Sequence, residues 1–227
     1  MKITYLGQAG FLLETGDVKI LIDPYLSNSV EKLQPQNCRR IPIDKRFLQI
    51  KPDIIVLTHN HLDHTDPETL QHYLTETSAI TVLASKNAWG EVRKFGGFNN
   101  NYVMFNQGTV WTEKGVRFQA VKAEHSDEYA IGVIIRMEEK NYYFTGDTLY
   151  SENVFDSIPK VEYAMCFLPV NGRGNNMNFV ESKCFVERVG AKYNVPIHFG
   201  MFDEINEMDV SLTNKISLSV YQPYQID

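Results

Sequence analysis

Short apolar runs separated by turn residues open the chain. The segments KITYLG, GFLLET and VKILID cover residues 2–7, 10–15 and 18–23, with the turn signals QAG and GD between them. The run IIVL at 54–57 is fully apolar and follows Pro52, which predicts a buried strand ending at Leu57. Further strand-like runs occupy 80–85, 102–105, 109–113, 116–124, 130–137, 141–146, 162–170 and 196–200.

Three stretches predict helices. Asp66 can cap a helix that has Pro67 at its first position and an apolar face from residue 70 onward. A second helix is predicted at 86–95, ended by two glycines, and a third at 178–193, where Asn178 and Glu181 form a capping pair. Residues 26–50 look irregular, with no helical or strand period.

Strand clusters mixed with helices, without repeats or linkers, indicate one layered α/β domain over residues 1–227. The net charge of -6 argues against nucleic acid or an anionic membrane as partner, since both require clustered positive charge. Three widely spaced cysteines without a C-x-x-C pair, and no signal peptide or membrane-length apolar run, fit a reducing cytoplasm.

The chemistry of the chain begins where the run IIVL stops. VLTHNHLDHTD, residues 56–66, holds three of the six histidines. Alternate residues of an extended segment point the same way, so His59 and His61 can converge on one ion. Asp63 and His64 follow and can point to a second. Imidazole and carboxylate are the ligands of zinc, manganese or iron in hydrolytic sites, so we interpret this segment as metal-binding rather than as a solvated polar loop.

Two metals need more donors than one turn provides. His125 in KAEHSD, Asp147 in YYFTGDT and His198 in VPIHFG each follow a predicted strand, and we favour a ligand role over core packing for all three. His72 lies off the apolar face of its helix and is expected at the surface. Asp23, in LIDPYL, either caps the turn before proline or orients a ligand histidine, and the sequence leaves both readings open.

Substrate contacts are expected from the loop VNGRGNNMN, residues 170–178. Its glycines expose backbone N–H groups, it leads into a helix N-terminus, and Arg173 can hold a phosphate bidentately. Asn171 and Asn176 belong to the same expected anion site. The alternative is an ordinary flexible loop with a solvated arginine, and Arg39 with Arg40 is a weaker anion candidate.

These residues resemble the metallo-β-lactamase superfamily. The positions that carry the resemblance, in family order, are Asp23, the HNHLDH run from His59 to His64, His125, Asp147 in FTGDT and His198. The resemblance implies a four-layer αββα sandwich with a two-metal site at one edge. It assigns His59, His61 and His125 to the first metal and Asp63, His64 and His198 to the second, with Asp147 bridging.

Within that superfamily the chain is most similar to the L-ascorbate-6-phosphate lactonase group, through LGQAGFLLE, LTHNHLDHTDPETL, LPVNGRGNNMN and PIHFGMFD. The similarity implies one or two divalent ions per chain, manganese or zinc, a cytoplasmic location and a homo-oligomer. The segment after Phe202 departs from the group, because it is short and lacks a clear acidic-aromatic helix.

The expected function is hydrolysis of a small anionic ester such as a sugar-phosphate lactone by metal-activated hydroxide. Asp63 is the expected catalytic carboxylate, and Asp63 or Asp147 could guide the proton. Two alternatives remain open. A metal-dependent phosphodiesterase would use the same ligands, and a non-catalytic metal-dependent ligand sensor would bind without turnover.

Overall fold

The computed structural model describes residues 1–226 and divides the chain into two compact units. Unit 1 contains Met1–Met104, Gly200–Asp203 and the chain from Leu218 onward, and unit 2 contains Phe105–Phe199 and Glu204–Ser217. Each unit has its own sheet and its own buried core. The assignment of a single domain to residues 1–227 stays a prediction.

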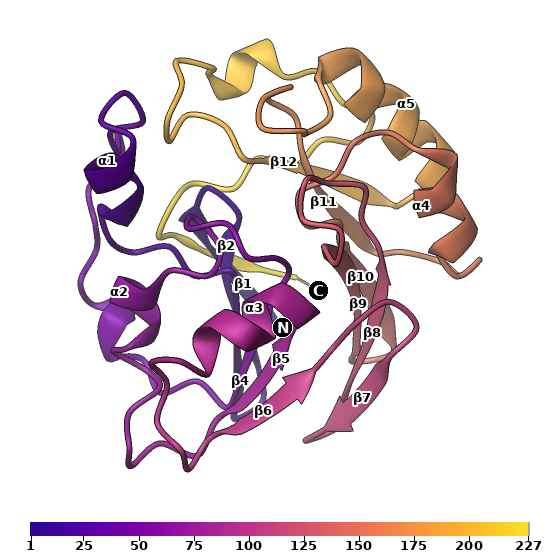
Figure 1. The fold of residues 1–227 in the computed structure, drawn as a ribbon. Coiled ribbons are helices and arrows are strands. Elements are labelled where there is room, and N and C mark those ends of the chain that lie inside the picture. The colour runs from indigo at the N-terminus through magenta and orange to yellow at the C-terminus, as the bar shows by residue number, and fades with distance from the viewer. Residues whose placement is uncertain (227) are drawn as a thin grey trace. The chain divides into compact units, whose positions relative to one another are not determined.

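Unit 1 is built on a seven-stranded sheet with the order β13-β1-β2-β3-β4-β5-β6 (Figure 1). Its strands are β1 Lys2–Gly7, β2 Gly10–Thr15, β3 Val18–Ile22, β4 Ile54–Leu57, β5 Thr81–Ala84, β6 Asn101–Met104 and β13 Pro223–Gln225. The pairs from β3 to β6 are parallel, whereas β13, β1, β2 and β3 pair antiparallel. Because β3 and β4 are parallel neighbours, the residues that follow them leave the sheet at the same edge. Asp23 N accordingly donates to Val56 O at 3.0 Å.

The helices of unit 1 are short: α1 Ser29–Leu33, α2 Pro67–Leu70, α3 Lys86–Val92 and the 3-10 turn Phe47–Gln49. The Asp66 side chain caps α2 by accepting from Glu68 N and Thr69 N, with Pro67 at the first turn as predicted. α3 ends at Val92, three residues short of the predicted end. α1 was missed within 26–50 because it spans five residues and has no side-chain cap. Leu21, Ile55 and Leu57 form the core with side chains from the helices.

Unit 2 is built on a six-stranded sheet with the order β12-β11-β10-β9-β8-β7 (Figure 1). Its strands are β7 Val110–Glu113, β8 Val116–Lys122, β9 Ile131–Met137, β10 Lys140–Phe144, β11 Met165–Pro169 and β12 Tyr193–Ile197. β10, β11 and β12 are parallel neighbours, so Asp147, Asn171 and His198, which follow them in turn, emerge at one edge.

Two helices of unit 2 are α4 Glu152–Ser157 and α5 Phe179–Val189. Their core contacts are apolar, and Tyr143 and Leu168 of the sheet share a buried cluster with Phe185 of α5. α5 begins at the predicted capping box but ends four residues before the predicted end. Its C-cap is Gly190, at a left-handed φ of 68°, and β12 starts three residues later. The 3-10 turn Glu207–Asp209 follows in the same unit.

Among residues 1–226, no helix has the length and apolar character that crossing a membrane requires.

Candidate functional site

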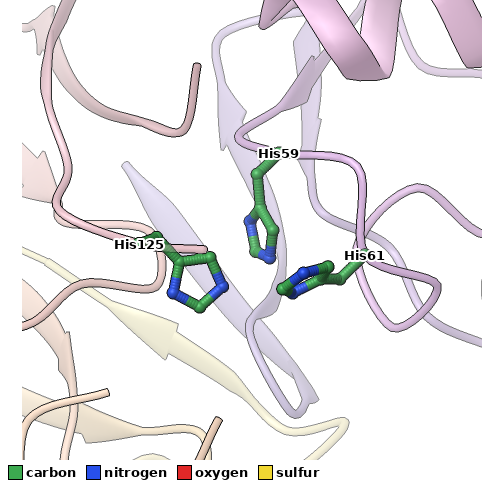
Figure 2. A group of neighbouring side chains, drawn as sticks. All are labelled: His59, His61 and His125. Carbon is green, nitrogen blue, oxygen red and sulfur yellow. The ribbon is translucent and has the colours of Figure 1, made fainter. Parts of the chain in front are cut away.

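The histidine cluster follows β4 on a turn that backbone and hydroxyl hydrogen bonds hold closed. His64 N donates to His61 O at 3.0 Å, and the Thr65 hydroxyl donates to His59 O at 2.7 Å. His59 and His64 are fully buried, with ring centroids 4.0 Å apart. The His61 ring is half-buried and lies edge-on to His59 with centroids 4.6 Å apart (Figure 2). The turn therefore brings the three imidazoles together, and the proximity of His59 and His61 agrees with their predicted convergence on one ion.

Asp23 contacts the start and the end of this turn. Its Oδ1 accepts from Thr58 N at 2.8 Å, and its Oδ2 lies 2.8 Å from His64 Nδ1. Of the two readings left open, the contacts are those of a residue that orients a histidine. Because a carboxylate only accepts, the His64 proton sits on Nδ1, and Nε2 is the nitrogen whose lone pair can bind a metal.

Thr58 connects Asp23 to His59 and so orients the His59 ring as well. The sequence analysis does not predict this contact. The Thr58 hydroxyl donates to Asp23 Oδ2 at 2.5 Å and lies 3.1 Å from His59 Nδ1. A hydroxyl has one proton, so Thr58 Oγ1 accepts from His59 Nδ1. One buried carboxylate thus sets the tautomer of two histidines, and both present Nε2 as the lone-pair nitrogen.

Asp63 is held by a residue from the first hairpin. Its Oδ2 accepts from Gln8 Nε2 at 2.7 Å and lies 3.7 Å from His64 Nε2. Gln8 is also absent from the sequence prediction. In the sequence, Gln8 stands out only as a polar residue in a glycine-flanked turn between two apolar strands.

In unit 2, Asp147 lies close to the two other predicted ligands, His125 and His198. This buried carboxylate follows β10, and its Oδ2 lies 3.0 Å from His198 Nε2 and 4.0 Å from His125 Nε2. His125, also drawn in Figure 2, follows β8, and its Nδ1 lies 3.2 Å from Asn175 O. The structure therefore brings together three side chains that are far apart in the sequence of unit 2.

The side chains present fit a divalent metal. In unit 1, the buried His59 and His64 rings have centroids 4.0 Å apart, and Nε2 is the lone-pair nitrogen of each. In unit 2, an imidazole and a carboxylate approach to 3.0 Å at Asp147. Imidazole nitrogen and carboxylate oxygen suit zinc, manganese or iron better than the soft metals that thiolates select. The three cysteines are all free.

The asparagines predicted to contact substrate support the ligands. Asn176 is buried, its Nδ2 donates to Asp147 Oδ2 at 2.8 Å, and its Oδ1 accepts from Thr148 N at 2.9 Å. Asn171 Nδ2 lies 3.2 Å from His198 Nδ1. Both amides therefore position Asp147 and His198, and their contact with substrate stays a prediction.

The N-terminus of α5 differs from the predicted anion seat. Val180 N and Glu181 N donate to Asn178 Oδ1 at 2.9 and 3.1 Å, and the Glu181 carboxylate accepts from Asn178 N at 2.9 Å. The first turn is already capped and carries a negative charge, which disfavours a second anion there. Of the predicted anion site, the exposed Arg173 side chain is still available to bind an anion. It lies between Gly172 and Gly174, whose φ angles are 64° and 62°.

The other cationic and histidine candidates lie elsewhere in unit 1. The Arg39 guanidinium donates to Tyr25 O at 2.8 Å and to Tyr221 Oη at 2.9 Å, so it links Tyr221 to the segment that follows β3. Arg40 is exposed, and its backbone N–H donates to Met201 O. His72 is exposed, as predicted.

The chain matches a known family over most of its length. The family model described as "Beta-lactamase superfamily domain" matches residues 2–198, a range that includes every predicted ligand. A Staphylococcus aureus protein named UPF0173 metal-dependent hydrolase is 26% identical over 221 residues, covering 91% of this chain and 89% of the relative. One of the same name from Aeropyrum pernix is 29% identical over 218 residues, covering 88% and 83%.

A solved structure supports the fold. The metallo-beta-lactamase fold protein YhfI from Bacillus subtilis is 16% identical and aligns with a TM-score of 0.74 over 99% of each chain. At this identity the likeness concerns the fold alone. The predicted α/β fold class with two sheets is thereby confirmed.

Proposed function

The chain belongs to the metallo-β-lactamase superfamily, and from this premise we propose that it is a metal-dependent hydrolase. Its proposed ligands for one or two divalent ions, manganese or zinc, are His59, His61, Asp63, His64, His125, Asp147 and His198. The observation that carries the proposal is the Asp23 network, which holds two buried histidines in the tautomer that metal binding needs. Both relatives named above support the hydrolase assignment by their names.

A divalent metal, when bound, would lower the pKa of its water to about 7 and so supply a nucleophile at neutral pH. The chain's own residues hold the proposed ligands in place and accept the proton. Asp63, fixed through Oδ2 by Gln8, is the proposed proton acceptor. Asp147 is held by Asn176, and its contact with His198 Nε2 keeps both side chains in place.

For the substrate we propose a small anionic ester, with a sugar-phosphate lactone as the leading class. The support is the exposed Arg173 guanidinium on the glycine-rich loop that also carries Asn171 and Asn176, the residues that hold His198 and Asp147. An arginine fork matches a phosphate bidentately. A focused positive charge can recruit an anion to a chain with net charge -6.

The proposal is tested by turnover of purified protein supplied with Mn²⁺ or Zn²⁺, against phosphorylated lactones and phosphodiesters in parallel. We expect lactone hydrolysis that is lost in Asp63→Ala, with an unchanged circular dichroism spectrum. Hydrolysis of phosphodiesters without turnover of lactones would show that the protein is a phosphodiesterase instead. Metal binding without turnover of either class would favour a ligand sensor.

Arg173→Ala separates the phosphate contact from the chemistry. A hydrogen bond to a charged group contributes about 1.5–3 kcal/mol, so KM for a phosphorylated lactone should rise roughly tenfold to hundredfold. KM for the unphosphorylated lactone should stay within about twofold of the parent. Equal effects on both substrates would remove Arg173 from phosphate recognition. Lys183→Ala, an exposed change on α5, serves as the matched control.

A further inference from the structure

We infer that Gln8 is a positioning residue for Asp63, and that the first hairpin of unit 1 is shaped to aim its amide at that carboxylate. The inference deepens the proposed function, on which it rests, because it matters only if Asp63 is a metal ligand. The juxtaposition is direct: Gln8 Nε2 donates to Asp63 Oδ2 at 2.7 Å across 55 residues of sequence.

The backbone at Gln8 is in a conformation that its residue type does not favour. Its φ is 55°, in the left-handed region that glycine, asparagine and aspartate populate more readily than glutamine. The register between β1 and β2 shifts between Tyr5 and Gly7, directly before it. Bulges of this kind redirect side chains beside functional sites, and strained non-glycine residues persist where the surroundings enforce them.

The surroundings enforce the turn from several sides. The Tyr5 hydroxyl donates to Gln8 O at 2.8 Å, so the backbone carbonyl is fixed. A Cβ added at Gly7 would lie 2.6 Å from Met201 Cε, and one added at Gly10 would lie 3.1 Å from Asp23 O. The hairpin is therefore packed closely against the segment that orients the histidines. Gln8 itself is 2% exposed, which leaves its amide little freedom to turn away.

The chemistry of the contact matches the needs of a metal ligand. A hydrogen bond from a neutral amide to a carboxylate is charge-assisted, so it is short and directional. Fixing one oxygen also sets the plane of the carboxyl group, as partners behind metal ligands commonly do. His64 Nε2, 3.7 Å from the same oxygen, places this contact beside a second proposed ligand.

A double-mutant cycle on metal affinity tests the inference. Gln8→Gly removes the amide and also relieves the left-handed strain, so a loss of affinity would not stem from a worsened backbone. The dissociation constant for Zn²⁺ is measured by competition with a chromophoric chelator, in the parent and in Asp63→Ala. Glu139→Gly, at an exposed turn residue with φ of 60°, relieves comparable strain far from Asp63 in sequence and serves as the control.

We expect Gln8→Gly to weaken Zn²⁺ binding at least about tenfold in the parent. In the Asp63→Ala background the same change should alter affinity less than about twofold, because its target is gone. Equal weakening in both backgrounds, or parent affinity in Gln8→Gly, would overturn the inference. If Asp63→Ala itself binds Zn²⁺ as tightly as the parent, the ligand assignment of Asp63 in the proposed function fails instead.

Discussion

At the scale of residues, one buried carboxylate organises the end of β4. Asp23 receives the backbone N–H and the hydroxyl of Thr58 and the Nδ1 proton of His64, so both of its oxygens are used. Its own φ of 40° places it at a sharp turn after β3. A negative charge buried to this extent is tolerated because several donors compensate the loss of water. The same hydrogen bonds orient His59 and His64, so that Nε2 of each ring is the nitrogen able to bind a metal.

Thr58→Val should weaken metal binding by about tenfold, because it keeps the shape of the side chain but removes the acceptor that fixes the His59 tautomer. Thr58→Ser keeps the hydroxyl and should bind within about threefold of the parent. The measurement is the Zn²⁺ or Mn²⁺ dissociation constant by chelator competition. The relay through Thr58 would be refuted if the valine and serine variants bound the ion equally.

The histidine cluster after β4 and the contacts of Gln8 and Asp23 differ in how far apart their residues are in the sequence. The cluster from His59 to His64 was predictable because its members are neighbours on one turn, and spacing alone brings them together. The contact of Gln8 with Asp63 spans 55 residues and that of Asp23 with Thr58 spans 35. Such contacts depend on which strands are neighbours, and the apolar pattern specifies strands without specifying their order.

At the scale of elements, the ends of parallel strands supply the predicted ligands of unit 2. Residues after β10, β11 and β12 meet because neighbouring parallel strands end at one edge. Helix ends follow local rules that were only partly visible in sequence. The capping box of α5 predicts its start, but the predicted end at residue 193 lies beyond the left-handed Gly190 at which the helix ends.

Two glycine-to-alanine changes in unlike positions should shift stability in opposite directions. Gly190 has a φ of 68°, and an added Cβ would meet no atom within 4 Å, so Gly190→Ala should cost about 1 kcal/mol through the backbone alone. Gly90 lies inside α3 with equally open space, and Gly90→Ala should stabilise by about 0.5–1 kcal/mol. Free energies of unfolding in urea provide the comparison. Gly190→Asn, which tolerates this conformation better, should recover part of the loss, and changes of the same sign at both glycines would contradict the account.

At the scale of the whole molecule, the apolar pattern predicts strands and helices but does not divide the strands between two sheets. The strand-like runs predicted α/β layers and the resemblance implied two sheets, whereas the strand order of each sheet is known only from the structure. The α1 helix and β13 were missed because each is too short to show a period. The contacts of Asp147 with His198 and Asn176 likewise follow from strand order, not from any local motif.

Metal binding should raise the stability of the folded chain by an amount that depends on the histidine cluster. An ion that binds only the native state at 100 times its dissociation constant stabilises by about 2.7 kcal/mol, which corresponds to an increase in Tm of about 5–10 °C for a chain of this size. Calorimetry with Zn²⁺ or Mn²⁺, and again after a chelator is added, measures this increase.

His61→Ala and His72→Ala form a matched pair for that measurement, because both remove an imidazole that is not fully buried. The ion-dependent increase in Tm should shrink markedly in His61→Ala, which loses a proposed ligand, and persist in His72→Ala, whose histidine lies on the surface of unit 1. Comparing each variant with and without the ion cancels any effect of the substitution on the metal-free fold. An increase of the same size in both variants would show that the ion binds away from the cluster after β4.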